Sequence, residues 1–435
     1  MGRRLPWIGN FQRDIHIHPL ADIRCRVVPQ LSLTIASRTD QESNVMKQES
    51  KPFPLQMSAD HMLARAREMT GIDIIDAEAV EPLRLLHAAY NTDACLHEQG
   101  ALAIEKKLLR LLSNRLRMQR DFARHPEIAE IQITNPTFVY GQLRSGTTKV
   151  QKLLTASGDF QYLPFWQTYN PSLISGSRTE SAQARQVRIE EADSFIHWFD
   201  NMSPDAKLGH RFSTFEPEEE SLILEHCLIT GAFIAFNTMT SYIQWLATQN
   251  PTITLESLRD MLKYLQWQSG EKKPWVLKSP LWVGLEPFIL DVFPDANLLM
   301  THRTPHKTIP SLFRLLDAFH APFSNKPPEY EMLRMMLAMG LEEHLKVRQS
   351  RPDINILDIG YDAVTGPSED IATKIYNFCG MPLRDETLQN IRNWEAANPI
   401  HKLGAFTYDP ADYQLKPEII DKDFGSYMEF ASHLF

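Results

Sequence analysis

The sequence predicts an α/β protein whose parallel sheet is covered by helices on both faces, a three-layer arrangement. Four short β-prone apolar runs occur at about 138–140, 275–277, 297–301 and 355–359. A segment with helical periodicity separates each run from the next, and this strand–helix alternation is typical of parallel sheets. The 435 residues, 43% of them hydrophobic, are ample for the core that such a fold needs.

The charge balance and the cysteine pattern narrow the class of protein. A net charge of −9 argues against a nucleic-acid binder, although a local basic pocket for a small anion stays compatible with it. The four cysteines form no CxxC pair, so we expect free thiols in a reducing compartment and no metal site. We expect neither a transmembrane segment nor a signal peptide, and therefore a cytoplasmic protein.

Three regions are predicted along the chain. Residues 1–56 show no sustained period and are expected to form an extension without regular structure. Residues 57–130 carry helical periodicity over 58–71, 77–89 and 93–122, and we expect these helices to pack on the core as an N-terminal helical extension. Residues 131–435 form the α/β domain itself.

Within that domain the remaining elements are predicted in order. An aromatic loop over 162–171 is expected to wall a pocket, and a helix follows over 180–200. The apolar text of 222–245 predicts one continuous helix, and further helices are expected at 329–349, 370–378 and 386–395. We expect the chain to end in an irregular tail.

The segment after the first strand has the character of a phosphate cradle. Arg144, Ser145 and Gly146 form a small-residue turn, and Thr147 and Thr148 open the next helix. Backbone N–H groups at a helix start attract anions, and glycine allows a phosphate to approach the backbone closely. An arginine fork and two hydroxyls add donors. An ordinary strand-to-helix turn remains the alternative explanation for this segment alone.

Two more strands end in cations on the same edge of the sheet. Arg303 ends the strand over 297–301, and Ser311 follows it eight residues later. An arginine with a hydroxyl suits a second phosphate, because ligands bind at the carboxyl ends of parallel strands. Lys278 follows the strand over 275–277, where an ammonium can stabilise a leaving oxygen. A structural arginine and a surface lysine are the alternatives.

Together these segments resemble the sulfotransferases that use 3′-phosphoadenosine-5′-phosphosulfate (PAPS), and in particular their large bacterial branch. The matching segments are Arg-Ser-Gly-Thr-Thr at 144–148, Trp-Val-Leu-Lys-Ser-Pro at 275–280, Phe-Pro-Asp-Ala at 293–296 and Pro-Glu-Glu at 217–219. The resemblance covers about residues 60–430. It implies a P-loop-type sheet, PAPS as the sulfuryl donor and no metal. It also implies that 144–148 binds the 5′-phosphosulfate and that Arg303 and Ser311 bind the 3′-phosphate.

The chain departs from the family pattern at several positions. Trp282 stands where the branch often has a histidine, and Pro280 stands where the cytosolic sulfotransferases have their catalytic histidine. The usual His-Arg-Asp-Pro reads His-Arg-Thr-Pro over 302–305. These departures leave the identity of the catalytic base open.

We expect the base to come from the glutamates that follow Pro217. Glu219 is placed first and Glu218 or Glu220 next, since adjacent carboxylates raise one another's pKa. His210 is the alternative base. For any one of these glutamates there is a simpler explanation: a negative charge in the first turn of a helix is stabilised by the helix dipole.

Two other functions stay open. A P-loop kinase or NTPase would carry G-x-x-x-x-G-K-[ST] and a strand-ending Asp, whereas this chain lacks that lysine and ends its strands in Lys278 and Arg303. A nucleotide-binding homologue without catalysis is the second. For the sulfotransferase, the acceptor is expected to be a small and partly hydrophobic molecule, and the sequence leaves a homo-oligomer open.

Overall fold

Four parallel strands form the central sheet of the protein, whose computed structural model describes residues 52–399 and 406–435. The strands are β1 (Thr137–Gly141), β2 (Val276–Lys278), β3 (Asn297–His302) and β4 (Ile356–Gly360). Their order across the sheet is β2-β1-β3-β4, and all neighbouring pairs are parallel. All four predicted strands are therefore present, and their carboxyl ends meet at one edge.

The central strand β1 is buried on both faces. Thr137 lies opposite Val276 on β2 and Asn297 on β3. Because side chains alternate along a strand, Phe138 enters the core on one face and Val139 the core on the other. This continuous apolar run is typical of a parallel sheet between two helical layers.

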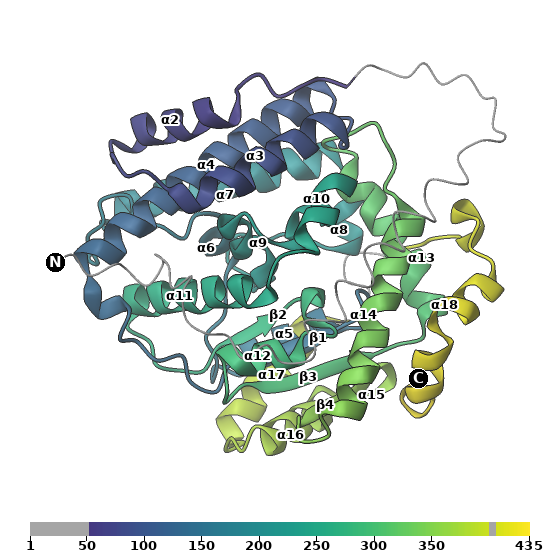
Figure 1. Ribbon diagram of the computed structural model, residues 1–435. Helices are drawn as coiled ribbons and strands as arrows, with labels where there is room; N and C mark the ends of the chain where they lie inside the picture. Colours follow the sequence, from purple (N-terminus) through teal and green to yellow (C-terminus); the bar gives the residue numbers. More distant parts are fainter. Residues whose placement is uncertain (1–51, 400–405) are drawn as a thin grey trace, which may run out of the picture.

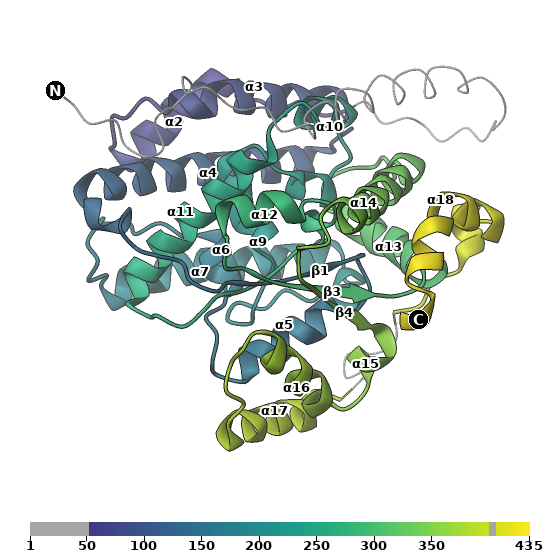
Figure 2. The ribbon, with the colours of Figure 1, turned by 60° about the horizontal axis from the view of Figure 1, so that its bottom comes forward.

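Helices cover both faces of the sheet (Figures 1 and 2). The Val139 face is covered by α5 (Thr147–Ala156), α16 (Ser368–Phe378) and α17 (Asp385–Ala397). The Phe138 face is covered by α11 (Pro251–Ser269), α12 (Glu286–Val292), α13 (Pro305–His320), α14 (Tyr330–Ser350) and α18 (Pro417–Phe430). The three-layer arrangement predicted from the sequence is confirmed.

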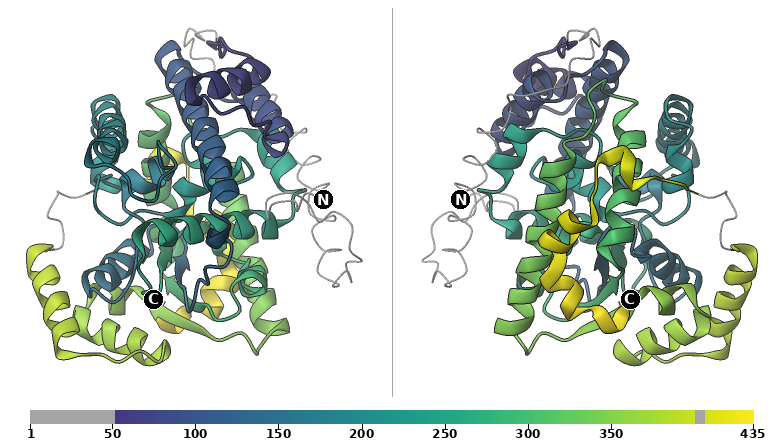
Figure 3. Two further views of the ribbon diagram at one scale, coloured as in Figure 1. Left: turned by 90° about the vertical axis from the view of Figure 1, so that its left-hand side faces the viewer. Right: turned by 90° about the vertical axis from the view of Figure 1, so that its right-hand side faces the viewer.

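Three N-terminal helices add a further layer at the end of the molecule opposite α16 and α17 (Figure 3). They are α2 (Ala59–Thr70), α3 (Ala77–Thr92) and α4 (Glu98–Arg124), and they share an apolar core with α7 (Ala182–Met202). Ser58 caps α2, and Gly71 ends it in the left-handed region at φ 64°. Helix α4 begins at Glu98, later than predicted, because the His97 side chain accepts from the N–H of Gly100.

The prediction of one continuous helix over 222–245 is wrong. The chain forms α9 (Glu220–Leu224), two 3₁₀ turns (Glu225–Cys227 and Gly231–Ala235) and α10 (Thr240–Leu246). Leu228 adopts φ 61° and interrupts the helical hydrogen bonding. The break lets Glu225 pair with Lys107 of α4, a tertiary contact that periodicity does not report.

The expected irregular tail is also wrong, because α18 is a regular helix. Ile420, Phe424 and Tyr427 recur at helical spacing and enter the core beside α13 and α14. The aromatic loop contains a short helix, α6 (Phe165–Tyr169), and two more short helices are α8 (Ala206–Gly209) and α15 (Tyr361–Thr365).

Some predictions fall outside the described part of the chain. Residues 1–51, most of the predicted N-terminal extension, lie outside it. None of the helices within 52–399 and 406–435 is long and apolar enough to cross a membrane.

Candidate functional site

The turn between β1 and α5 has the backbone of an anion cradle. Arg144 and Gly146 both adopt positive φ, 72° and 96°. A Cβ added at Gly146 would lie 2.7 Å from Val364 Cγ1, so only glycine fits the turn. Helix α5 begins directly after it at Thr147, and its first N–H groups have no helical acceptor. The predicted loop therefore points free donors at the carboxyl edge of the sheet.

The five predicted loop residues do not all face this edge. Arg144, Gly146, Thr147 and Thr148 line the cavity above it. The fully buried hydroxyl of Ser145 instead donates to the carbonyl of Gln142 at 2.5 Å and contacts the Thr301 hydroxyl at 2.6 Å. Ser145 thus holds the turn to β3 and presents no side chain to a ligand.

Arg144, Arg303 and Ser311 meet beside the loop. Arg144 Nε donates to Ser311 Oγ at 3.2 Å, and Arg303 Nη1 donates to the carbonyl of Arg144 at 2.9 Å. The guanidinium of Arg303 also stacks on the ring of Tyr361, 3.9 Å from its centroid. Two arginines from different strand ends and one hydroxyl of α13 therefore converge on one point.

No carboxylate of the described residues forms an ion pair with either arginine. Burial and the neighbouring charge of Arg303 lower the pKa of Arg144. Two crowded guanidiniums in a partly buried position need an anion to offset their repulsion and desolvation. A doubly charged phosphate, whose terminal oxygens all accept hydrogen bonds, meets that need.

These residues line a cavity of about 760 Å³, which we call the basic cavity. Seven lysines and arginines line it against three carboxylates, although the whole chain is acidic. The cations are Arg144, Lys149, Lys152, Lys207, Arg211, Lys278 and Arg303. The aromatic side chains of Trp394 and Phe406 also line it and offer flat apolar surface beside the charge.

The predicted lysine and two of the four predicted bases line the basic cavity. Lys278 is 1% exposed, and its Nζ forms an ion pair with Glu219. His210 Nε2 lies 3.0 Å from Glu218 Oε1 and 3.1 Å from Oε2. His210, Glu218 and Lys278 line the cavity, whereas Glu219, which is paired with Lys278, is not among the lining residues.

The three glutamates have different surroundings. Burial alone would raise the pKa of Glu218, but the His210 ring and the Lys278 ammonium hold it below its ordinary value. Glu220 is fully buried, and its carboxylate accepts hydrogen bonds from the backbone N–H of Lys278 and from the indole N–H of Trp282. Burial raises the pKa of Glu220 to about 7, and the charge of Glu219 adds to the rise. Trp282, which departs from the family pattern, thus holds the Glu220 side chain in the protein interior.

Some lining residues were missed in the sequence. Lys149 and Lys152 follow the loop on α5, one helical turn apart, and that spacing could have identified them. Tyr361, Trp394 and Phe406 come from distant segments, and no local pattern marks them. His302, the last residue of β3, is not among the lining residues, and its ring contacts the Tyr427 hydroxyl and Asp358.

A second cavity of about 340 Å³ is separated from the basic cavity by the segment 210–225, which lines both. We call it the aromatic cavity, since its lining includes Phe165, Tyr169, Phe195, Trp198, Phe212 and Phe236. The wall is residues 210–225. His210 and Glu218 face the basic cavity, and Phe212, Leu222 and Glu225 face the aromatic one. The rings of His210 and Phe212 are 5.0 Å apart, so one side-chain layer separates the cavities.

Known proteins are similar to this chain in sequence and in fold. Two curated relatives, both omega-hydroxy-beta-dihydromenaquinone-9 sulfotransferase Stf3, come from Mycobacterium tuberculosis and Mycobacterium bovis. Each is 21% identical over 362 residues, which cover 78% of this chain and 86% of the relative.

Two crystal structures share the fold. Sulfotransferase STF1 from Mycobacterium tuberculosis superposes with a TM-score of 0.72 at 24% identity, covering 86% of this chain and all of that chain. Sulfotransferase STF9 from Mycobacterium avium superposes with a TM-score of 0.74 at 24% identity, covering 90% of this chain and 98% of that chain. The P-loop-type fold predicted from the sequence is confirmed.

A family model covers the site itself. The model described as the sulfotransferase family matches residues 136–385, more than half of the chain. That range contains β1 and its turn, the wall between the cavities, Lys278, Arg303 and Ser311. The chain belongs to the sulfotransferase family and is an enzyme that transfers a sulfuryl group.

Proposed function

We propose that the protein transfers a sulfuryl group from PAPS to a hydroxyl, or an amine, of a small and partly hydrophobic acceptor. One observation carries the proposal: the cradle turn and the Arg144–Arg303–Ser311 group line the same cavity as Lys278 and His210. A donor with phosphates at both its 3′ and 5′ positions suits a cavity that is lined by both the cradle turn and the Arg144–Arg303–Ser311 group. A hydrophobic acceptor is supported by the aromatic cavity and by the quinone derivative in the name of Stf3.

The residues present fit the nucleotide. The free N–H groups of the turn and first turn of α5 suit the 5′-phosphosulfate. Arg303 and Ser311 suit the 3′-phosphate, with Arg144 between the two groups and bonded to Ser311. Trp394 and Phe406 offer faces for a purine ring.

Catalysis then depends on holding the donor, stabilising the leaving phosphate and removing the acceptor proton. Lys278 would stabilise the charge that develops on the bridging oxygen as the S–O bond to phosphate breaks. Glu219, paired with the Lys278 ammonium, would position it. The new S–O bond forms to the acceptor oxygen, whose proton leaves to the base.

For the base, the geometry favours His210 with Glu218 over Glu219. Glu218 is held as a carboxylate, which only accepts hydrogen bonds, so His210 Nε2 donates to it. Nδ1 of a neutral His210 is then the acceptor, on a side chain that lines the basic cavity. A histidine oriented by a carboxylate is a recurrent form of general base.

The proposal is tested first by binding. Adenosine 3′,5′-bisphosphate (PAP) should bind in the presence of EDTA as tightly as with Mg²⁺, measured by isothermal titration calorimetry. Tight binding of Mg·ATP with no affinity for PAP would instead support the kinase or NTPase alternative. PAPS with a pooled panel of hydrophobic alcohols and phenols should then give sulfated product. PAP binding with no product from any acceptor would favour a homologue without catalysis.

The base is tested by comparing two variants. His210→Gln should lose turnover, whereas Glu219→Gln should lose less, because it weakens only the positioning of Lys278. If Glu219→Gln abolishes turnover and His210→Gln does not, the base is Glu219, as first expected from the sequence.

A further inference from the structure

We propose that the aromatic cavity is the acceptor subsite and that it selects compact aromatic alcohols or phenols which carry a carboxylate or similar anionic group. This inference rests on the proposed function and adds to it the chemical class of the acceptor. It comes from the charge, the size and the position of the aromatic cavity.

The charge of the cavity wall is unbalanced. Lys106, Lys107 and Arg110 of α4 line it, and Glu225 is the lining carboxylate. Glu225 is already paired with Lys107, whose ammonium also lies 4.6 Å from the centroid of Phe236. The Lys107–Glu225 pair is therefore self-contained, and Arg110 is left with no carboxylate from the described residues.

Arg110 is held in place but not satisfied. Its guanidinium lies over the ring of Tyr169, 3.7 Å from the centroid, and Nη1 donates to the Tyr169 carbonyl. Its Nε is buried and has no hydrogen-bond partner. An ordered guanidinium with unused donors in an aromatic cavity is stabilised by an anion, and a carboxylate matches its fork geometry.

The size of the cavity limits the acceptor. A cavity of roughly 150 Å³ holds one benzene molecule, and the aromatic cavity measures about 340 Å³. It therefore accommodates one ring with a short side chain or two rings. Its lining includes the exposed side chains of Gln99, Lys106 and Leu102, the last of which is 54% exposed.

The aromatic cavity lies one side-chain layer from the proposed base. Phe212 lines it, and the Phe212 ring lies 5.0 Å from that of His210 on the other side of the wall. Backbone hydrogen bonds from the N–H of Phe165 to Glu216 and from the N–H of Trp166 to Thr214 tie α6 to this wall. An acceptor whose anion meets Arg110 therefore shares its cavity with Phe212, the side chain that separates it from His210.

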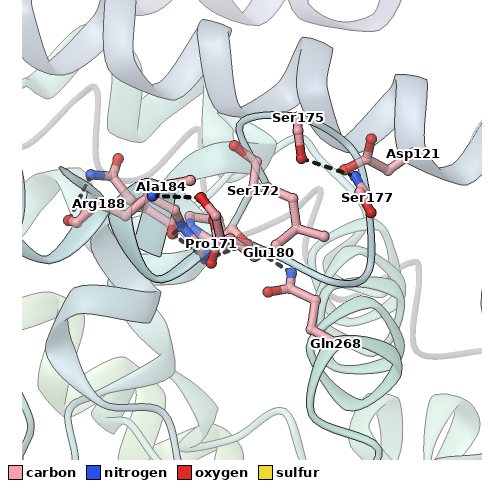
Figure 4. Close-up of polar contacts among 12 residues, drawn as sticks. Asp121, Pro171, Ser172, Ser175, Ser177, Glu180, Ala184, Arg188 and Gln268 are labelled. Carbon is pink, nitrogen blue, oxygen red and sulfur yellow. Dashed lines mark hydrogen bonds and ion pairs between the residues drawn. The ribbon is translucent and has the colours of Figure 1, made fainter. Parts of the chain in front are cut away.

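Two of the helices that line the cavity are fixed by the loop that joins them (Figure 4). Helices α6 and α7 are joined through residues 170–181. Arg188 of α7 donates to the carbonyls of Asn170 and Pro171 and to Glu180, and Gln268 donates to Pro171 as well. The cavity is thus formed before a ligand arrives, which favours selection by shape and charge.

The test uses two acceptors that differ only in charge, 3-(4-hydroxyphenyl)propanoic acid and its methyl ester. Their affinities are measured by calorimetry with saturating PAP, and their sulfation with PAPS. The acid should bind the wild-type protein more tightly than the ester by about 10- to 100-fold, the range expected for one charge-assisted contact. Binding should quench the fluorescence of Trp198, and Trp198→Phe should remove that quench.

Arg110→Gln should abolish the preference by raising the Kd and KM of the acid about 10- to 100-fold, with the ester unchanged. Arg110→Lys should retain part of it, and Arg124→Gln, an exposed change on the same helix, should retain all of it. The affinity for PAP should be the same in every variant.

Equal affinity for acid and ester in the wild-type protein would overturn the inference, as would an equal loss of both in Arg110→Gln. Failure to bind PAP would instead overturn the proposed function. Calorimetry reports acceptor binding even where turnover is slow, so the two failures are distinguishable.

Discussion

The basic cavity and the aromatic cavity share the wall formed by residues 210–225 but differ in how the chain builds them. The basic cavity lies at the carboxyl edge of the sheet, where the fold itself brings the ends of β1, β2 and β3 together. The aromatic cavity is assembled from helices α4, α6 and α7, which no strand register aligns. The difference separates a site set by topology from one set by helix packing.

The charges of the two cavities differ in the same way. In the basic cavity, cations outnumber carboxylates and come from several segments. In the aromatic cavity, the cations come from a single helix: Lys107 is paired with Glu225, Lys106 is exposed, and Arg110 has no carboxylate partner among the described residues. We therefore expect loss of one cation to weaken nucleotide binding in the first and to change acceptor choice in the second. The predictions below test that separation.

The largest effect is expected from the shared wall. His210→Gln should lower kcat by about 10²- to 10⁴-fold, the usual contribution of a general base, while PAP affinity stays unchanged. Sulfation of one acceptor at saturating PAPS and PAP calorimetry measure the two quantities. His61→Gln, an exposed change on α2, is the control. A matching loss of PAP affinity would mean that His210 belongs to nucleotide binding.

The same wall should make stability depend on pH. The folded pKa of Glu220 is about 7 against an ordinary value of 4.5, so the folded state holds this proton more tightly than the unfolded state. Its contribution therefore falls as pH rises from about 4.5 to about 7, by about 3 kcal/mol in all. Urea unfolding at pH 5 and pH 8 measures the change.

Glu220→Gln should remove this part of the pH dependence, because its side chain does not titrate. Glu256→Gln, on the exposed side of α11, should keep the wild-type slope. An unchanged slope in Glu220→Gln would show that the carboxyl of Glu220 is not the group responsible.

Loss of either arginine at the sheet edge should weaken PAP binding by about 100-fold, the upper range for a charge-assisted contact. Arg144→Met and Arg303→Met test this by calorimetry, with the exposed Arg65→Met as the control. The aromatic cavity should keep its affinity for acceptor. An acceptor affinity that falls in parallel would show that the two cavities are one binding unit.

The smallest effect is expected at Ser311. Ser311→Ala removes one hydroxyl and one partner of Arg144 Nε, at 3.2 Å. PAP affinity should fall about fivefold, corresponding to one neutral hydrogen bond. Calorimetry against PAP and against adenosine 5′-phosphate separates the 3′-phosphate contact, because the second ligand should bind both proteins equally.

The sequence predicted the sheet and its edge well because local signals specify both. Four β-prone runs, each followed by helical text, predict a parallel sheet, and parallel strands share one edge. Arg144, Lys278 and Arg303 follow three of these strands, so their convergence on one cavity follows from topology. Trp394 and Phe406 could not be predicted in the same way, because helix packing alone brings them to the cavity.

The sequence was less informative about the wall between the cavities. The apolar segment 222–245 has helical periodicity, but the chain breaks at Leu228 and Glu225 pairs with Lys107 of α4, a contact that the local pattern does not report. The three adjacent glutamates are indistinguishable in sequence. In the structure Glu218 forms a hydrogen bond with His210, Glu219 forms an ion pair with Lys278, and the buried Glu220 accepts a hydrogen bond from Trp282.

The sequence by itself determined the fold class, the cradle turn and the cations at the strand ends. Each depends on residues close together in the chain or on the shared edge of parallel strands. Only the tertiary structure decided which carboxylate faces the basic cavity and where the aromatic cavity lies. Burial and pairing are set by contacts between segments far apart in sequence, and the same residue type takes a different role in each surrounding.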